Sequence, residues 1–345
     1  AKEGTIAPYG PKLGPIGMIE TLEAAKAHPH YSAPLGPNQG RGVASGFWFN
    51  IGGETSSSIT INEDGTVGLT LGTTDIGGSR ASMAMMASEE LGVPMDLIKP
   101  VIGDTNSLGF NFLTGGSRAT FSTGMTVVRS TREAIEELRK RAALLWEVDL
   151  DQVEWVDGHA RLIAGDEPKT MSLAQIAKQA GKTGGPIMAN CSMNVTGAGP
   201  SLGTHIVDVE VDTETGKVSI VRYTAIQDAG KAIHPAYVEG QMQGGAVQGI
   251  GWALNEEYIY NDKGQLENAG FLDYRIPVCS DVPMIDTVIV EVPNPNHPYG
   301  VRGVGETPII PPLAAISNAV SRATNIRFNE LPLSPPKVLA RLMHG

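Results

Sequence analysis

Cysteine is scarce in this sequence. Its 345 residues include only Cys191 and Cys279. Two thiols are too few to hold an iron–sulfur cluster or a four-cysteine zinc site within the chain. They also argue against a disulfide scaffold, so we expect the protein to work in a reducing, cytoplasmic compartment.

The sequence also lacks long apolar runs and an excess of basic residues. No stretch approaches the roughly 18 uninterrupted apolar residues that a membrane helix needs. The formal charge is −11 at pH 7, from 26 Lys and Arg against 37 Asp and Glu. An acidic protein repels nucleic acid and anionic membranes, so neither is an expected partner. With 41% hydrophobic and 18% charged residues, the composition is typical of an ordered globular protein.

Familiar metal-binding motifs are missing, whereas glycine is abundant. The seven histidines show no HExxH or other metal-ligand spacing, so the sequence predicts no metal site built from protein side chains. The 42 glycines suit positions where the backbone turns with positive φ or approaches a ligand closely. They cluster before or within predicted helices, as Gly77 and Gly78, Gly115 and Gly116, Gly244 and Gly245, Gly249 and Gly251, and Gly303 and Gly305.

Hydrophobic periodicity predicts an α+β chain. The predicted helices are 17–27, 79–92, 120–145, 173–180, 236–254 and, as the final helix, 311–323. The predicted strands are a hairpin at 56–74, strands at 97–104, 152–156 and 160–163, a hairpin at 204–230, a strand pair at 256–268 and an edge strand at 286–292.

The order of these elements divides the chain into an arm and two subdomains. Each subdomain has a hairpin, then a glycine turn carrying an aspartate, then a helix. This internal repeat predicts two similar α+β subdomains of mixed sheet with packed helices. The predicted parts are 1–45 for the arm, 46–200 for the first subdomain and 201–345 for the second.

One glutamate stands where a catalytic base is expected. In VRGVGETPIIPPLAAISNAV (301–320), a glycine loop places Glu306 ahead of a helix that starts with prolines. Backbone N–H groups at a helix N-terminus favour an ionised carboxylate. A rigid, ionised glutamate that faces a cleft can act as a general base. The alternative is that Glu306 only stabilises the helix N-terminus.

Three glycine-rich stretches have the character of ligand-binding turns. TGGSRATFSTG (114–124) leads into a helix with exposed N–H groups and hydroxyls that suit a phosphate; a simple capped turn is the alternative. GTTDIGGSRAS (72–82) is similar, with Arg80 as a possible counter-charge, although surface solvation is the default for an arginine. GQMQGGAVQGIGWAL (240–254) is a helix whose glycines fit either a bound ligand or close packing.

Together these motifs resemble the molybdenum hydroxylase family of xanthine dehydrogenase, aldehyde oxidase and the carbon monoxide dehydrogenase large subunit. The matching stretches follow one another in the family's order. They are HPHYSAPLGPNQGRGVASGFW (28–48), TDIGGSRASMAMMASEELGVP, TGGSRAT, GQMQGGAVQGIGWALNEE and GVGETP. The resemblance implies the molybdopterin-binding fold and oxidation of a C–H bond in an N-heterocycle or aldehyde, with water as the oxygen source. The metal would belong to the pterin cofactor.

The resemblance also implies roles for particular residues. Glu306 corresponds to the family's catalytic glutamate. Many relatives have Gly-Gln-Gly where this chain has Gly77-Gly78-Ser79, so cofactor contact there falls to backbone amides or to Arg80. The implied contacts to the molybdenum-pterin cofactor, as molybdopterin or its cytosine dinucleotide, are Gly77, Gly78, Ser79, Arg80, Gly115, Gly116, Ser117, Arg118, Ala119, Thr120 and Gln248.

Family large subunits are much longer than this chain, which begins with Ala1 rather than Met. The resemblance therefore implies the C-terminal half of a split large subunit, working beside a second molybdopterin-binding polypeptide. Partner subunits carrying a 2Fe-2S cluster and FAD would remove electrons. Two other hypotheses remain open: a non-catalytic module that binds a phosphate-bearing ligand, and a reductase of the same family.

Overall fold

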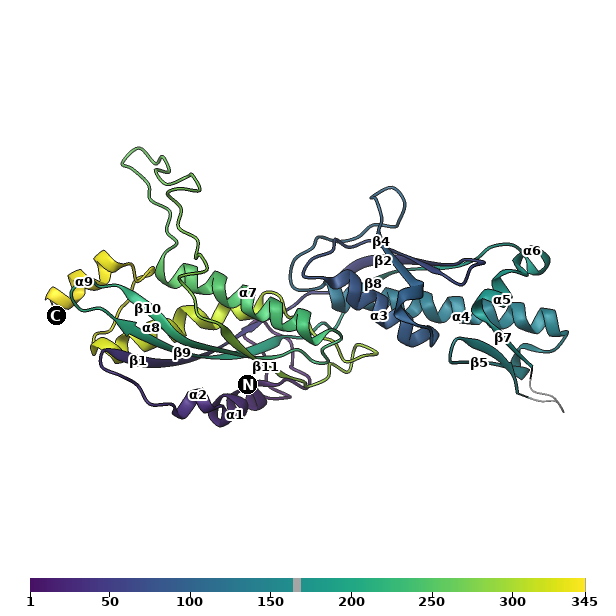
Figure 1. The fold of residues 1–345 in the computed structure, drawn as a ribbon, viewed down its shortest axis with the longest axis horizontal. Coiled ribbons are helices and arrows are strands. Elements are labelled where there is room, and N and C mark those ends of the chain that lie inside the picture. Colours follow the sequence, from purple (N-terminus) through teal and green to yellow (C-terminus); the bar gives the residue numbers. More distant parts are fainter. Residues whose placement is uncertain (164–168, 345) are drawn as a thin grey trace. The chain divides into compact units, whose positions relative to one another are not determined.

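The computed structural model describes residues 1–163 and 169–344. They form two compact units, and each is described by itself. Unit 1 comprises Ala1–Phe49, Gly199–Asn294 and Arg302–Gly345, and unit 2 comprises Asn50–Ala198 and Pro295–Val301. Figure 1 shows the elements of both units.

Unit 1 is built on a four-stranded mixed sheet. Its strands, in order across the sheet, are β1 (Gln39–Trp48), β9 (Ser201–Val211), β10 (Val218–Asp228) and β11 (Ile285–Val290). The pairs are antiparallel except β10 and β11, which are parallel. Its helices are α1 (Met18–Ala27), α2 (Pro29–Ser32), α7 (Pro235–Leu254), the 3-10 turn η4 (Thr307–Ile309), α8 (Ile310–Thr324) and α9 (Pro335–His344).

Alternating side chains decide which helices cover which face of this sheet. Val207 and Val209 of β9 belong to the core cluster that includes residues of α7 and α8. Ile206, one position away, packs with Ala25 of α1 on the opposite face. Because successive strand residues point to opposite faces, the sheet lies between α1 on one side and α7 with α8 on the other.

Unit 2 has a second four-stranded mixed sheet and a small three-stranded one. The larger sheet has the order β4 (Ile98–Ile102), β3 (Val67–Leu71), β2 (Gly53–Ile61) and β8 (Ile187–Val195), and the smaller has β5 (Val153–Val156), β6 (His159–Leu162) and β7 (Thr170–Ser172). The helices are α3 (Ser79–Leu91), α4 (Gly124–Trp146), α5 (Leu173–Ala177) and α6 (Ala180–Thr183), with short turns η1 (Met95–Leu97), η2 (Ala119–Thr123) and η3 (Leu150–Gln152).

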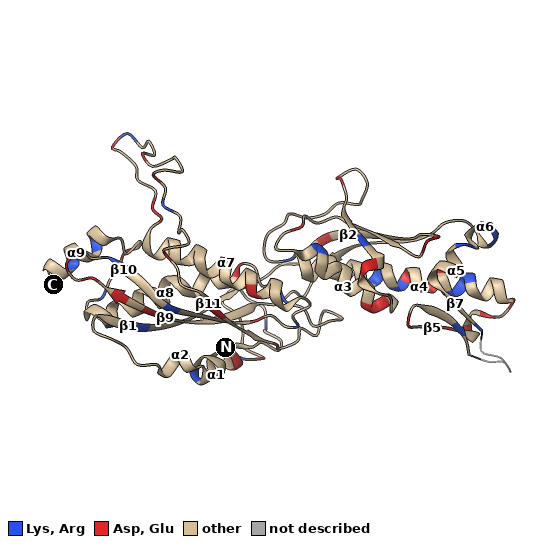
Figure 2. Ribbon diagram, in the orientation of Figure 1, with Lys and Arg blue, Asp and Glu red and all other residues tan. Residues whose placement is uncertain are grey.

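The burial pattern of helix α4 explains why this long amphipathic segment packs on the larger sheet of unit 2. Val128, Leu138 and Ala142 are fully buried at helical spacing. Arg132 and Lys140 of the same helix are exposed, and Figure 2 colours the charged positions along the α4 ribbon. Burial of one apolar stripe fixes the helix against the sheet and leaves the charges in solvent.

The two larger sheets share one strand order. In each, a hairpin is followed by a turn and a helix, and then by a strand parallel to the second hairpin strand. In unit 2 this run is β2–β3–α3–β4, and in unit 1 it is β9–β10–α7–β11. The order of hairpin, turn and helix predicted from the sequence is therefore present in both units.

The division of the chain differs from the predicted one. Residues 1–49 do not form a separate arm, because β1 pairs along its whole length with β9 and the segment belongs to unit 1. Residues 295–301, expected in the second subdomain, belong to unit 2.

Several predicted elements also differ from those observed. The strand pair expected at 256–268 is wrong, since only an isolated bridge joins Tyr260 and Leu266 there. Strands β1 and β8 lie where no strand was expected, and α9 follows the helix expected to be the last. The chain is confirmed as an α+β fold of mixed sheets with packed helices.

Candidate functional site

Glu306 lies at the end of a loop in unit 1, directly before η4. Its backbone has φ −98° and ψ −19°, and its side chain is partly buried. Turn η4 runs straight into α8, so Glu306 precedes one continuous helical segment. The N-terminal N–H groups of such a segment favour a negative charge nearby.

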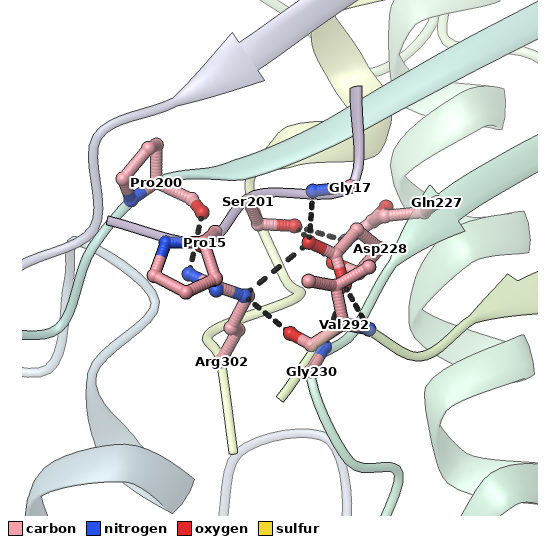
Figure 3. Close-up of polar contacts among 9 residues, drawn as sticks. All are labelled: Pro15, Gly17, Pro200, Ser201, Gln227, Asp228, Gly230, Val292 and Arg302. Atoms are coloured by element: carbon pink, nitrogen blue, oxygen red, sulfur yellow. Dashed lines mark hydrogen bonds and ion pairs between the residues drawn. The ribbon is translucent and has the colours of Figure 1, made fainter. Parts of the chain in front are cut away.

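A buried ion pair anchors the start of this loop. Arg302 Nε lies 3.3 Å from Asp228 Oδ2, and neither side chain is more than 2% exposed (Figure 3). The carboxylate also accepts backbone N–H groups of Gly17, Gly230 and Val292 at 2.9–3.1 Å. Burial raises the pKa of Asp228, and Arg302 and these three amides counter the rise. The carboxylate is thus fully surrounded by donors.

The guanidinium of Arg302 is equally engaged. It donates to the backbone carbonyls of Val292, Pro200 and Pro15 (Figure 3). Burial lowers the pKa of Arg302, and Asp228 counters the effect. Arg302 therefore joins three distant segments of unit 1 at the base of the Glu306 loop.

Gln227 holds the middle of the loop. Its Nε2 donates to the carbonyl of Val304 at 3.0 Å and to Ser201 Oγ at 3.2 Å. Ser201 Oγ in turn donates to the carbonyl of Asp228 at 2.6 Å. Because Gln227 is fully buried in β10, these contacts tie the loop to the sheet only two residues before Glu306.

The glycines of α7 allow a close approach to the segment that follows Glu306. A Cβ on Gly249 would lie 2.6 Å from Pro312 Cγ and 2.8 Å from the Ile309 carbonyl, and one on Gly245 would lie 2.9 Å from Pro308 Cβ. Close packing thus accounts for these two glycines.

Gln248 lies on the exposed side of α7, beside Gly249. A Cβ on Gly244, one turn before Gln248, meets nothing within 4 Å. Glu306 and Gln248 therefore belong to neighbouring elements of the same unit, and open space surrounds the exposed face of the helix at Gly244.

In unit 2, the turn before α3 contains two successive glycines in the left-handed region of backbone conformation. Gly77 and Gly78 both have positive φ, 58° and 77°. Within residues 1–163 and 169–344, the amides of these two glycines donate no hydrogen bond to another protein group. Successive N–H groups in such a turn form a concave donor set suited to phosphate.

The side chains of the same turn contact neighbouring residues of the turn itself. Arg80 pairs with Asp75 through Nε and Oδ2 at 3.1 Å, and its amide donates to Asp75 Oδ1. Ser79 is buried, and its hydroxyl donates to the Thr74 carbonyl. The turn therefore offers backbone amides more readily than side chains to a ligand.

The second glycine loop of unit 2 is fixed by a buried arginine. Arg118 is 2% exposed and donates to the carbonyls of Gly52, Glu54, Phe112 and Leu113 at 2.5–3.3 Å. Its guanidinium is thus engaged within the protein, where it shapes the loop.

The rest of that loop leads into a helix. Gly116 and Ser117 have positive φ, and Ala119 and Thr120 begin η2, a π-helical turn that continues into α4. Thr114 Oγ1 lies 3.2 Å from Thr74 Oγ1, so the two predicted turns of unit 2 are adjacent. Gly77–Arg80 and Gly115–Thr120 are therefore brought together in unit 2.

Sequence reasoning missed the residues that hold these loops. Gln227 and Arg302 received no role, and Asp228 entered only as the aspartate of the turn in the second subdomain. His297 was also missed: it is buried beside Phe121, with ring centroids 5.6 Å apart, and burial lowers its pKa to about 4. A charged or polar residue inside an otherwise apolar strand, as at Gln227 and Asp228, was the available signal.

Two negative findings concern the described residues only. Among residues 1–163 and 169–344, no three His, Cys, Asp or Glu side chains gather closely enough to hold a metal ion. Over the same part of the chain, every helix is too short or too polar to cross a membrane.

The comparisons with known proteins identify the family to which the chain belongs. A family model described as a molybdopterin cofactor-binding domain matches residues 20–283. The chain belongs to this family, the molybdopterin-binding domain of xanthine dehydrogenase, carbon monoxide dehydrogenase and aldehyde oxidoreductase.

Two curated relatives and one solved structure illustrate the relationship. The putative xanthine dehydrogenase molybdenum-binding subunit XdhA of Escherichia coli K12 is 34% identical over 286 residues, covering 81% of this chain and 38% of that subunit. The nicotine 6-hydroxylase large subunit of Paenarthrobacter nicotinovorans is 31% identical over 296 residues, covering 82% and 36%. Quinoline 2-oxidoreductase from Pseudomonas putida 86 has the same fold, with a TM-score of 0.83 at 24% identity, covering 99% and 47%. The chain thus spans less than half the length of each.

Proposed function

We propose that this chain is the C-terminal half of the molybdopterin-binding large subunit of a molybdenum hydroxylase, with Glu306 as its general base. The observation that carries the proposal is the fixed position of Glu306, at the N-terminus of η4 on a loop held by Gln227 and by the Asp228–Arg302 pair. A rigidly held carboxylate at such a place takes a proton without first losing conformational freedom.

The backbone of unit 2 suits the phosphate-bearing part of the cofactor. Gly77 and Gly78 offer two amides with positive φ at the start of α3. We assign the phosphate tail of molybdopterin, or of its cytosine dinucleotide, to these amides, to Ser79 and to the backbone of 115–120. Arg118 shapes that loop from inside, and Arg80 supplies positive charge at the edge of the turn.

In unit 1, Gln248 supplies an exposed amide side chain and Glu306 a carboxylate. The bound molybdenum-pterin group supplies the redox chemistry. Glu306 would accept a proton from the water whose oxygen is added to the substrate. Gln248 would hold the pterin through hydrogen bonds from its side-chain amide. Proton transfer by a positioned side chain contributes on the order of 10²–10⁴ in rate.

The substrate class we propose is an N-heterocycle or an aldehyde, oxidised at a C–H bond with water as the oxygen source. The names of the two curated relatives and of the solved structure include a xanthine dehydrogenase, a nicotine 6-hydroxylase and a quinoline oxidoreductase. We further propose a second molybdopterin-binding polypeptide, together with subunits carrying a 2Fe-2S cluster and FAD, in the cytoplasm.

The test is the composition and activity of the enzyme purified from its source. Native mass spectrometry with metal and pterin analysis should give one molybdenum and one pterin per copy of this chain. The Glu306→Gln enzyme should retain molybdenum and pterin but lose turnover. Glu330→Gln, a change at an exposed glutamate of the same unit, should retain molybdenum, pterin and turnover. A complex without molybdenum that binds a nucleotide would instead support a phosphate-binding module. Viologen dyes in oxidised and reduced form distinguish a hydroxylase from a reductase.

A further inference from the structure

Residues 255–284 form an arm that leaves unit 1 between α7 and β11. Figure 1 shows it as the green two-limbed segment that projects beyond α7. No regular helix or strand occurs in it, and its two limbs meet at the isolated bridge between Tyr260 and Leu266. We call residues 255–284 the projecting arm.

The projecting arm has a defined internal structure. The Ile259 amide donates to Asn268 Oδ1 at 2.9 Å, and Asn268 Nδ2 donates to the Glu257 carbonyl at 2.6 Å. Tyr274 Oη donates to Glu256 Oε2 at 2.7 Å, which holds the second limb to the base of the first. The arm is thus preorganised, so binding through it costs little further conformational entropy.

Large apolar side chains of the arm stand in solvent. Phe271 is 102% exposed, Leu272 96% and Met284 85%. Others that are at least about half exposed are Tyr258, Ile259, Tyr260, Ile276 and Val278. Isolated exposed apolar residues are ordinary, but a preorganised projection that carries many of them marks an interaction site.

The charge of the arm argues against its pairing with the arm of a second copy. Residues 255–284 contain six acidic side chains and two basic ones, Lys263 and Arg275. Figure 2 shows the acidic residues in red along both limbs. Two such arms in contact would bring like charges together, which disfavours the pairing. The complementary surface is an apolar pocket with a basic rim.

We propose that the projecting arm docks onto the part of the large subunit that this sequence does not contain, inserting Phe271 and Leu272 into an apolar pocket with a basic rim. This rests on the proposed function, which requires the remaining part of that subunit. The length relationship supports this choice of partner: the chain matches only 36–38% of the length of the two curated relatives described above, which leaves most of the large subunit to provide the pocket.

The test uses the enzyme that contains the complete large subunit. Hydrogen exchange should show residues 269–276 protected in the assembled enzyme. The double variant Phe271→Asp and Leu272→Asp should remove this protection. Where the remaining part is a separate polypeptide, the variant should also weaken its retention at least about tenfold in native mass spectrometry, as expected when two interface anchors are lost.

A matched control is Met343→Asp, which places the same charge on an apolar side chain of α9 that is 72% exposed. This variant should leave the hydrogen exchange of residues 269–276 and the retention of the remaining polypeptide unchanged. The proposal is overturned if residues 269–276 exchange in the wild-type assembly as fast as the exposed loop 104–107. It is also overturned if the double variant separates two copies of the enzyme and leaves each large subunit whole.

Different measurements test the docking proposal and the proposed function. Molybdenum and pterin are measured on the same samples. If they are absent from the wild-type enzyme, the proposed function fails, while protection of the arm still reports docking. If they are present and the arm is unprotected, only the docking proposal fails.

Discussion

Asp228 Oδ2 and Arg302 Nε lie 3.3 Å apart in the interior of unit 1, and the Asp228 side chain has no exposure to solvent. The pair joins the end of β10 to the first residue of the loop that carries Glu306. Three backbone amides complete the shell of Asp228, and three carbonyls accept from Arg302. The position of the candidate base therefore depends on a buried charge pair.

We expect Asp228→Asn to lower the free energy of unfolding by about 3–5 kcal/mol, because Arg302 would keep a buried charge without its partner. Urea unfolding of the purified protein measures this loss. Asp286→Asn, at an exposed position on β11, should change the unfolding free energy by less than about 0.5 kcal/mol. Equal effects of the two substitutions would contradict the structural importance of the pair.

Two glycines of α7 give opposite predictions for the same substitution. Gly249→Ala should destabilise the protein by about 1–3 kcal/mol, because its Cβ would meet Pro312 and the Ile309 carbonyl. Gly244→Ala should stabilise it by about 0.5–1 kcal/mol, because alanine favours the helix and its Cβ meets nothing within 4 Å. Urea unfolding of both variants checks the signs. A stable Gly249→Ala protein would show that the close contact between α7 and the Pro308–Pro312 segment is absent.

Arg118 and Arg80 each follow a Gly-Gly-Ser sequence, yet their surroundings differ. Arg118→Gln should lower the free energy of unfolding by about 3 kcal/mol or more, since it removes a buried charge-assisted donor from four carbonyls. Arg80→Gln should cost at most about 1 kcal/mol, because its pair with Asp75 is half exposed. Thermal melting with pterin analysis tests this: Arg118→Gln should also release cofactor. The prediction fails if the two variants have the same melting temperature.

His297 should make the stability of unit 2 depend on pH. Burial lowers its pKa from 6.5 to about 4 in the folded protein, so between these values the unfolded chain binds a proton that the folded chain does not. The contribution of His297 to the free energy of unfolding is complete above pH 6.5. It is lost as the pH falls towards 4, by at most about 1.4 kcal/mol per pH unit. His297→Gln should flatten the dependence measured by urea unfolding between pH 7 and pH 4.5. An unchanged slope would contradict this role.

The sequence predicted the local features of the fold well. Both central hairpins, the helices α3, α4, α7 and α8 and the glycine turns follow from short-range signals such as periodicity and turn residues. Strand β1 was missed because its residues alternate irregularly with glycine, which is present where α8 approaches: a Cβ on Gly42 would fall within 2.5 Å of backbone atoms of Ala315 and Ala319. Such a reason is tertiary and cannot be read from a local pattern.

The candidate site shows the same limit. Glu306 and the glycine turns were predicted from their own sequence context. Gln227, Asp228 and Arg302 were not, because their partners lie far away in the chain; Arg302 donates to Pro15, 287 residues earlier. Long-range partners of this kind become visible only once the strands are placed.

The most direct test of the central claim is one turnover of the molybdenum-loaded enzyme with substrate, measured for wild type and for Glu306→Gln and expressed per bound molybdenum. If Glu306 is the general base, the variant should reduce its centres about 10²–10⁴-fold more slowly while binding substrate and molybdenum as the wild type does. A variant that is reduced at the wild-type rate would contradict the account.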